Sequence, residues 1–330
     1  MTNPPEFDVS SGGAIAIQQP VAIQRKGPYR LFWERLREDK AALGGGVVIV
    51  LLILIAIFGG PLASSITGHG ANDIVPNSQD QFGVPLGPSS HLWFGADAEG
   101  RDLFVRTLYG ARISLFVGIV ASGIAVFIGL VVGLTAGFFG GIIDTILSRF
   151  ADVLLAVPQI LIAVGIVAAC STTKQGCRVL HIFTLQPGVP VVIFVITLFS
   201  WSYIARIVRG FTLSLREKEF VESARAAGAT NFRILWQEIL PNLVGPLIVY
   251  STLLIPSNIL FEAGLSFLGL GVPSTTPSWG QILSEVYTDG LYNVAWWLML
   301  FPGAFLIITT LAFNLLGDGL RDAFDVRTER

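Results

Sequence analysis

The sequence predicts an all-α polytopic membrane protein with six transmembrane helices, on the strength of its composition and its apolar runs. Hydrophobic residues make up 52% of the 330 positions and charged residues only 13%, whereas about 25% of a soluble domain is charged. The mean hydropathy is +0.68, so much of the surface must face lipid. Apolar runs of about 20 residues, the length that crosses a bilayer, occur at 43–62, 113–137, 142–169, 189–209, 242–264 and 292–317.

The basic residues predict the orientation of these spans. If the N-terminus lies inside, 16 of the 21 Lys and Arg residues fall in inner segments and five in outer segments. Cytoplasmic loops of membrane proteins carry such an excess. We therefore expect cytoplasmic tails at 1–42 and 318–330, and a cytoplasmic polar loop at 210–241.

The first part of the chain is expected to contain one span between two polar segments. Residues 1–28 are rich in Pro, Gln, Gly and Ser, lack the apolar core of a signal peptide, and are expected to be disordered. The basic, aromatic segment 29–40 is expected to lie along the inner membrane surface. The first transmembrane helix is placed at 43–65, and an extracytoplasmic segment at 66–112.

The end of that outer segment is amphipathic. Asp102 and Arg106 have the i,i+4 spacing that favours an ion pair on a helix. Two interpretations are open for the segment: a surface helix that leads into the second span, or a rim on which an outer partner docks.

The core domain is placed at 113–317 and contains five spans. Small residues recur at every fourth position of the second span, which allows another helix to approach closely: Ala121, Ala125, Gly129, Gly133 and Gly137. The third span begins with charges, among which Arg149 and Asp152 have the spacing of a pair, and Pro158 is a candidate kink. At the outer end of the sixth span, Trp296 and Trp297 are typical of an interfacial aromatic belt.

The only two cysteines, Cys170 and Cys177, lie in the outer loop after the third span. A disulfide persists on the oxidising side of a membrane, so a bridge and two free thiols are both open. Two cysteines without a histidine cluster do not make a zinc site.

The fifth span contains the candidate residues of a translocation path. Pro246 and Pro256 can break this helix, and backbone freed at membrane depth usually lines a cavity. Glu262 is an acid in an apolar span and is therefore a candidate path residue, together with Ser257 and Asn258. The alternative for Glu262 is a structural carboxylate that ties down the Gly-rich turn after it.

The polar loop at 219–241 predicts a short helix, a glycine stop and a second helix. The first helix is expected from Glu219 to Ala227 and to stop at Gly228, and Thr230 and Asn231 are good N-caps for the next. A loop with both charge signs and small residues is what a membrane protein presents to a soluble partner. The alternative is an ordinary solvated loop.

The same loop resembles a known motif. Glu222, Ala224, Gly228, Leu240 and Pro241 match the pattern E-A-A-x-x-x-G, nine residues, I-x-L-P, of importer permeases of the ABC (ATP-binding cassette) class, with Ser in the first Ala position and Glu in the Ile position. The stretches 91–115, 265–280 and 314–325 resemble the dipeptide and oligopeptide branch of this family.

The resemblance implies a type I ABC importer permease fold in a bacterial cytoplasmic (inner) membrane. It implies a second homologous permease subunit, one or two cytoplasmic ATPase subunits, an extracytoplasmic substrate-binding protein and a peptide substrate moved by alternating access; it implies no nucleic acid. The residues it implies for coupling to the ATPase are Glu219, Glu222, Ser223, Ala224, Arg225, Gly228, Ala229 and Pro241.

The chain itself is not expected to be an enzyme or to hold a cofactor. None of its lysines lies in a G-x-x-x-x-G-K-[ST] motif, so ATP and Mg are expected on partner ATPase subunits. The alternatives that remain are a permease for nickel or another small solute in the same family, and a stand-alone secondary transporter.

Overall fold

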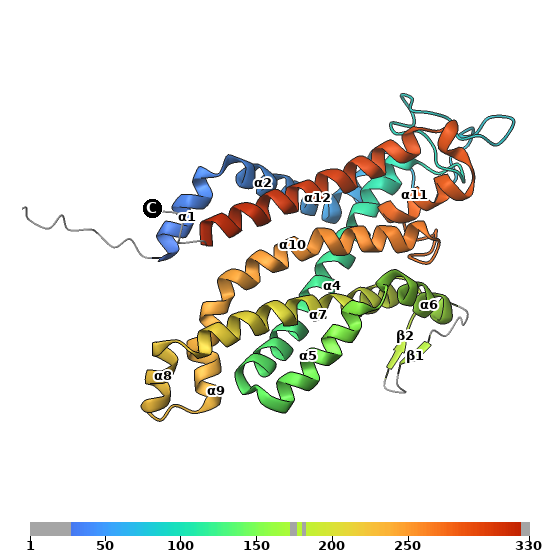
Figure 1. The fold of residues 1–330 in the computed structure, drawn as a ribbon. Coiled ribbons are helices and arrows are strands. Elements are labelled where there is room, and N and C mark those ends of the chain that lie inside the picture. Colours follow the sequence, from blue (N-terminus) through green and yellow to red (C-terminus); the bar gives the residue numbers. More distant parts are fainter. Residues whose placement is uncertain (1–27, 172–176, 180–182, 325–330) are drawn as a thin grey trace, which may run out of the picture.

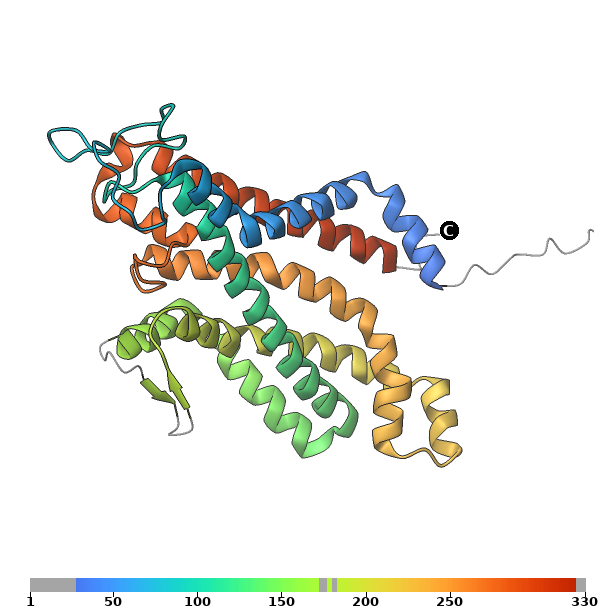
Figure 2. The same ribbon diagram turned by 180° about the vertical axis from the view of Figure 1, so that it is seen from behind.

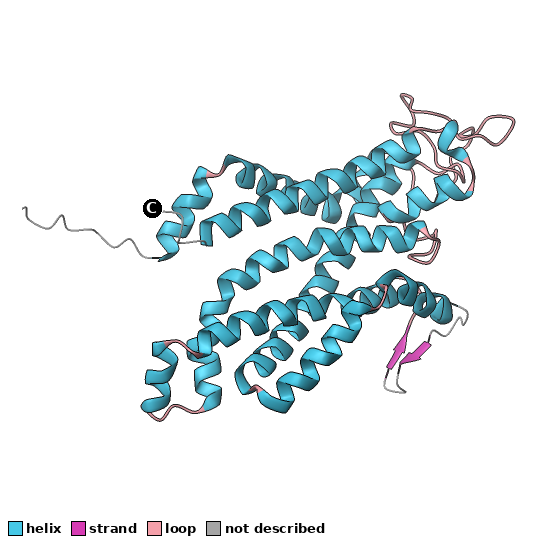
Figure 3. Cartoon of the chain, in the orientation of Figure 1, coloured by secondary structure: helices cyan, strands magenta, loops and turns pink. Residues whose placement is uncertain are grey.

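A computed structural model describes residues 28–171, 177–179 and 183–324 and shows an almost wholly helical chain (Figure 3). The helices are α1 (Pro28–Glu38), α2 (Lys40–Leu54), η1 (Ile55–Gly59), α3 (Gly60–Thr67), α4 (Leu103–Phe139), α5 (Gly141–Ala156), α6 (Gln159–Ser171), α7 (Val189–Arg216), α8 (Glu219–Ala226), α9 (Asn231–Arg233), η2 (Ile234–Ile239), α10 (Leu240–Phe267), α11 (Trp279–Thr288), η3 (Leu291–Asn293) and α12 (Trp297–Phe324). The strands β1 (Cys177–Val179) and β2 (Phe183–Leu185) form an antiparallel pair. The expectations for 1–27 and for 325–330 fall outside the described residues.

Five helical stretches of the described chain are long and apolar enough to cross a membrane: Lys40–Thr67, Leu103–Phe139, Val189–Arg216, Asn231–Phe267 and Trp297–Phe324. A sixth crossing is obtained if α5 and α6 count as one span, and these two helices are bent by 85°. The bend lies at the predicted kink, because Val157 before Pro158 is extended (ψ 138°), the conformation that proline imposes on its predecessor.

The two ends of the bundle differ. In Figure 1, α1, the C-terminal end of α12 and the α8–α9 pair lie at the left, and α11 and the loop at 68–102 lie at the right. Both ends of the described chain are thus on the side of α8, as an even number of crossings requires. Helix α1 packs on α12 through the rings of Phe32 and Phe324, whose centroids are 4.4 Å apart.

Helix α4 crosses the bundle and packs along α7 (Figure 2). The predicted small-residue stripe lies in this contact: a Cβ on Gly129 would be 2.7 Å from the Ile204 side chain, and one on Gly137 would be 2.7 Å from Thr212. The helix begins at Leu103, well before the span predicted from 113, because the Asp102 carboxylate caps it by accepting from the amides of Phe104 and Val105.

The ion pair predicted between Asp102 and Arg106 is wrong. The cap occupies one oxygen of Asp102, and the other lies 3.3 Å from His69 Nδ1. Arg106 is fully buried and pairs with Asp97, whose Oδ2 lies 2.9 Å from Arg106 Nε. The sequence spacing was compatible with a pair, but burial of the arginine required a partner that only the folded loop supplies.

The pair predicted between Arg149 and Asp152 is also replaced by contacts between helices. Asp152 on α5 pairs with Arg206 on α7. One turn further along α7, Arg209 makes a bidentate contact with Asp144, with N–O distances of 2.5 and 2.7 Å. These pairs hold α5 against α7, an arrangement that spacing within one helix cannot reveal.

Helix α10 runs unbroken through Pro246 and Pro256, so the predicted break within this span is wrong. Each proline removes one backbone hydrogen bond, and packing on α4, α7 and α12 keeps the rest of the helix together. The irregularity lies earlier, where the π-helical turn η2 directly precedes Leu240 and Pro241.

The end of the bundle opposite the α8–α9 pair is closed by the loop at 68–102, which folds onto α11 and the start of α12. Trp297 is 7% exposed and donates from Nε1 to the carbonyl of Ala96, 3.1 Å away, so its predicted place in the aromatic belt is wrong. Trp296 is 56% exposed. Near this end a disulfide joins Cys170, in the last turn of α6, to Cys177 in β1.

The α4–α7 contact gives a stability prediction. In Gly133→Ala the added methyl group would lie 2.6 Å from the Ala205 carbonyl oxygen and 2.7 Å from Val208 Cβ, so the helices must separate. We expect a loss of about 1–3 kcal/mol, measured as a lower thermal midpoint in detergent. Gly123→Ala is the control on the same helix, since a Cβ there has nothing within 4 Å. Equal thermal midpoints for Gly133→Ala and Gly123→Ala would contradict the close packing of α4 on α7.

The disulfide gives a second prediction. Because the chain contains only two cysteines and the structure joins them, a maleimide-linked polymer added to protein unfolded in detergent should modify neither thiol. Reduction before labelling should expose both. The measurement is the gel shift with and without reductant, and modification of the unreduced sample would show that the bridge does not form.

Candidate functional site

The polar loop between α7 and α10 forms a helical hairpin that projects from one end of the bundle (Figure 1). Helix α8 ends in a Schellman motif: the amide of Ala229 donates to the carbonyl of Ala224, and that of Gly228 to Arg225. Gly228 has φ +84°, a conformation that costs a residue with a Cβ about 1 kcal/mol or more. The predicted glycine stop therefore has a conformational reason.

The second half of the hairpin begins where the sequence predicts. The Thr230 hydroxyl caps α9 by accepting from the amide of Arg233, and the helix then continues through η2 into α10. Pro241 is accommodated by the wider turn that precedes it, since proline has no N–H to donate to the turn before it. Pro241 lies at the start of α10, away from the tip of the hairpin. The helix continues from η2 into α10 without a gap at this proline.

Two buried side chains fix the hairpin to the bundle. Val221 on α8 and Ile234 on η2 are both 0% exposed and belong to one cluster with Val208 of α7 and Leu243 of α10. A displacement of the hairpin must therefore be transmitted to these two long helices. This is the property that a mechanical contact with a partner requires.

The opposite face of the hairpin is exposed and mixed in character. Of the residues proposed for coupling, Glu219, Glu222, Ser223, Arg225 and Gly228 are exposed, and Ala224 and Ala229 are half-buried at the turn. The sequence analysis missed two exposed aromatic residues beside them, Phe232 (70%) and Trp236 (57%), whose ring centroids are 5.9 Å apart. Their i,i+4 spacing within a polar loop was the available signal.

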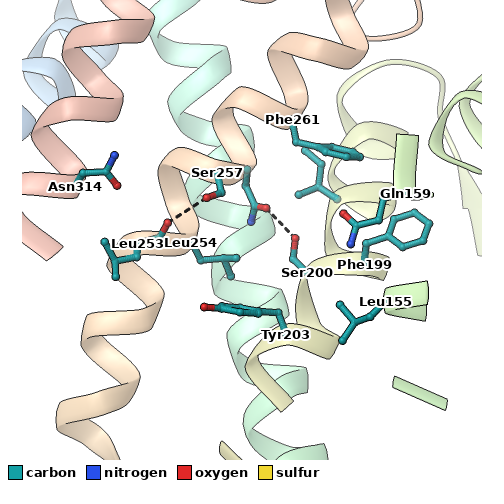
Figure 4. A pocket seen from close by; sticks show the side chains of 12 residues that line it. Leu155, Gln159, Phe199, Ser200, Tyr203, Leu253, Leu254, Ser257, Phe261 and Asn314 are labelled. Carbon is teal, nitrogen blue, oxygen red and sulfur yellow. Dashed lines mark hydrogen bonds between the residues drawn. The ribbon is translucent and has the colours of Figure 1, made fainter. Parts of the chain in front are cut away.

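A cavity of about 520 Å³ that is open to the surface lies between α7, α10, α12 and the α5–α6 bend (Figure 4). Ser257 and Asn258, two of the three residues proposed for the path, line it. Asn258 is held by its neighbours: Ser200 Oγ donates to its Oδ1 at 2.8 Å, and its Nδ2 donates to Ser122 Oγ at 2.9 Å. These bonds join α10 to α7 and to α4.

Glu262, the third residue proposed for the path, is absent from the lining of this cavity. It is 0% exposed. Its Oε1 accepts from Ser266 (2.8 Å) and Ser278 (2.9 Å), and its Oε2 from Ser114 (3.2 Å). Ser278 in turn caps α11, so the carboxylate joins α10, α4 and the start of α11. This geometry corresponds to the alternative stated for Glu262, a structural role.

A buried cluster of charged side chains fastens the loop at 68–102 to α11. Arg101 pairs with Asp97 and Glu285 at 2.6 and 2.7 Å, and Arg106 lies 3.5 Å from Glu285. Burial raises the pKa of Glu285, while Arg106 and Arg101 act to lower it. The described residues contain no group of three or more His, Cys, Asp or Glu side chains placed to hold a metal ion.

Comparison with known proteins matches two segments of the chain to family models. Residues 129–330 match the family described as binding-protein-dependent transport system inner membrane component. Residues 27–81 match the N-terminal TM domain of oligopeptide transport permease C. The glutathione transport system permease protein GsiD of Salmonella paratyphi A is 43% identical over 312 residues, 94% of each protein. GsiD of Shigella flexneri is 42% identical over 302 residues, which cover 92% of this chain and 91% of the relative.

A solved structure shows the same fold. A chain of the MetNI methionine ABC transporter, in an inward-facing conformation, superposes with a TM-score of 0.52 and 23% sequence identity, covering 66% of this chain and 96% of that chain. Together with the family match, this confirms the type I importer permease fold expected from the sequence.

The contacts of Glu262 predict what its removal does. Glu262→Leu leaves the hydroxyls of Ser114, Ser266 and Ser278 without their acceptor inside the protein, and each buried unpaired group costs about 1–3 kcal/mol. We expect a lower thermal midpoint and less assembled complex. Glu262→Gln keeps the shape of the side chain and one acceptor oxygen, so its thermal midpoint should fall less. A stable Glu262→Leu protein with selectively lost transport would instead return this residue to the path.

Proposed function

Because the chain belongs to the family of binding-protein-dependent transport system inner membrane components, we propose that it is the permease subunit through which an ATP-driven importer moves peptides. The permease role in an ABC importer follows from the family. The peptide substrate and the mechanism are the proposal.

The substrate class is supported by the named relatives. Two proteins that align over more than nine-tenths of this chain are named for glutathione transport, and glutathione is a tripeptide. The match at residues 27–81 is to a domain named for oligopeptide transport. A short peptide is the substrate class that these names share.

For the partners, too, one part follows from the family and the rest is proposed. An importer permease of this family works with an ATPase and a substrate-binding protein. We propose further that a second homologous permease completes the path, and that one or two ATPase subunits hold ATP and Mg on the side of the α8–α9 hairpin, which is then cytoplasmic. The exposed face of α8, with Glu222 and Arg225, is the proposed docking surface.

The observation that carries the mechanism is the anchoring of this hairpin. Val221 and Ile234 bury its inner face against α7 and α10, and both of these helices line the cavity of Figure 4. Closure of the ATPases on ATP would draw the hairpins of two permeases together. That motion would tilt α7 and α10 and open the path outward, and hydrolysis would return it to the inward state.

Two substitutions test the coupling role. A Cβ added at Gly228 meets no neighbour within 4 Å, so Gly228→Val is expected to act through the left-handed backbone and to reshape the end of α8. Glu222→Arg reverses one exposed charge of the docking face. We expect both to leave the protein folded and to lower ATP-dependent tripeptide uptake about tenfold, as a loss of about 1.4 kcal/mol in coupling would. Uptake into vesicles and a pull-down of the ATPase measure the effect.

The matched control is Gly290→Val. Gly290 also has positive φ (68°) and open space around its Cβ, but it lies after α11 at the other end of the bundle. The Gly290→Val protein should carry a similar backbone strain, fold, and bind the ATPase normally. Full uptake and ATPase binding in both hairpin variants would remove the coupling role from α8.

A further inference from the structure

Among the residues that the structure describes, those that line the cavity in Figure 4 include no charged side chain. Its members are apolar or aromatic, or carry an amide or a hydroxyl: Leu155, Gln159, Ile196, Phe199, Ser200, Tyr203, Leu253, Leu254, Ser257, Asn258, Phe261 and Asn314. The volume of about 520 Å³ falls within the ~300–1,000 Å³ of small-ligand pockets. Such a surface can bind a solute through hydrogen bonds and apolar contact, without attraction to either charge sign.

Three polar groups of this lining have unused hydrogen-bonding capacity. Within the described part of the chain, the side chains of Gln159, Tyr203 and Asn314 make no hydrogen bond. Figure 4 shows Gln159 and Asn314 on opposite sides of the cavity, with Ser257 between them. They contrast with Asn258, whose amide is bonded to Ser200 and Ser122 and shapes the wall.

The chemistry of these groups matches a peptide backbone. A carboxamide presents both N–H donors and a carbonyl acceptor, which is the pattern of a peptide bond. Two carboxamides at opposite sides of a cavity can each pair with a backbone amide, whatever side chains the peptide carries. A free polar group at membrane depth is costly unless water or a solute satisfies it.

We infer that this cavity is a contact site for the backbone of the transported peptide, with Gln159 and Asn314 bonding its amide groups. The inference rests on the proposed function and extends it to a rule of selectivity: the permease recognises the peptide bond and does not sort peptides by net charge. Discrimination by charge is then left to other components of the importer.

The test uses the complete importer reconstituted in vesicles, with binding protein saturated by one of three tripeptides: Ala-Glu-Ala, Ala-Ala-Ala or Ala-Lys-Ala. Saturation removes the preference of the binding protein from the comparison. In the wild type we expect the uptake rates of the acidic and basic peptides to agree within about threefold, because no lining charge attracts or repels them.

Gln159→Glu and Asn314→Asp introduce a carboxylate at each side of the cavity without changing the size of the side chain. A carboxylate beside a passing peptide repels the acidic tripeptide and attracts the basic one, so we expect the ratio of their uptake rates to shift by roughly threefold or more. The control is Asn293→Asp, the same change at an exposed position outside the cavity, which should leave the ratio unaltered.

The outcomes separate the inference from the proposed function. A shift in the ratio for both cavity variants, absent in the control, supports the contact site. An equal decrease in the uptake rates of all three peptides, or no decrease, would overturn the contact site, because a structural role does not depend on peptide charge. ATP-dependent uptake of tripeptides by the wild type would still stand in that case. A wild type that transports no tripeptide overturns the proposed function itself.

Discussion

The close contact between α4 and α7 is the constraint on which the rest of the structure depends. Lipid supplies no hydrophobic force between helices, so their association relies on packing and on hydrogen bonds. Glycines at every fourth position let the α4 backbone lie against Ile204 and the Ala205 carbonyl. With α7 fixed in this way, its residues 196–203 form one wall of the cavity, and its C-terminal end leads directly into the α8–α9 hairpin.

This arrangement connects the two candidate sites through rigid elements. The hairpin is anchored on α7 and α10 by Val221 and Ile234, and the same two helices contribute Ser200 and Asn258 to the cavity. The hydrogen bond between these two residues joins the helices halfway between the ends of the bundle. A movement at the hairpin therefore has a short physical route to the cavity, through two helices and one polar contact.

The features predicted from sequence were those that depend on local chemistry. The Gly228 stop, the Thr230 cap, the kink at Pro158 and the small-residue stripe each follow from a few adjacent residues, and the structure contains all of them. Partners of buried charges could not be predicted in the same way. Arg106 pairs with Asp97 in the folded loop before α4, and Asp152 pairs with Arg206 on another helix. Spacing within one helix therefore suggested the wrong pairs.

Polar side chains within the bundle fall into two groups, those with hydrogen-bond partners and those without, and this division supports the path proposed above. Glu262 and Asn258 are satisfied by hydroxyls of neighbouring helices, so they hold the bundle together without needing water. Gln159 and Asn314 have no such partner among the described residues. Lipid cannot supply one. The cavity side of α7, α10 and α12 must therefore meet water, a solute or a second polar surface, as the wall of a translocation path does.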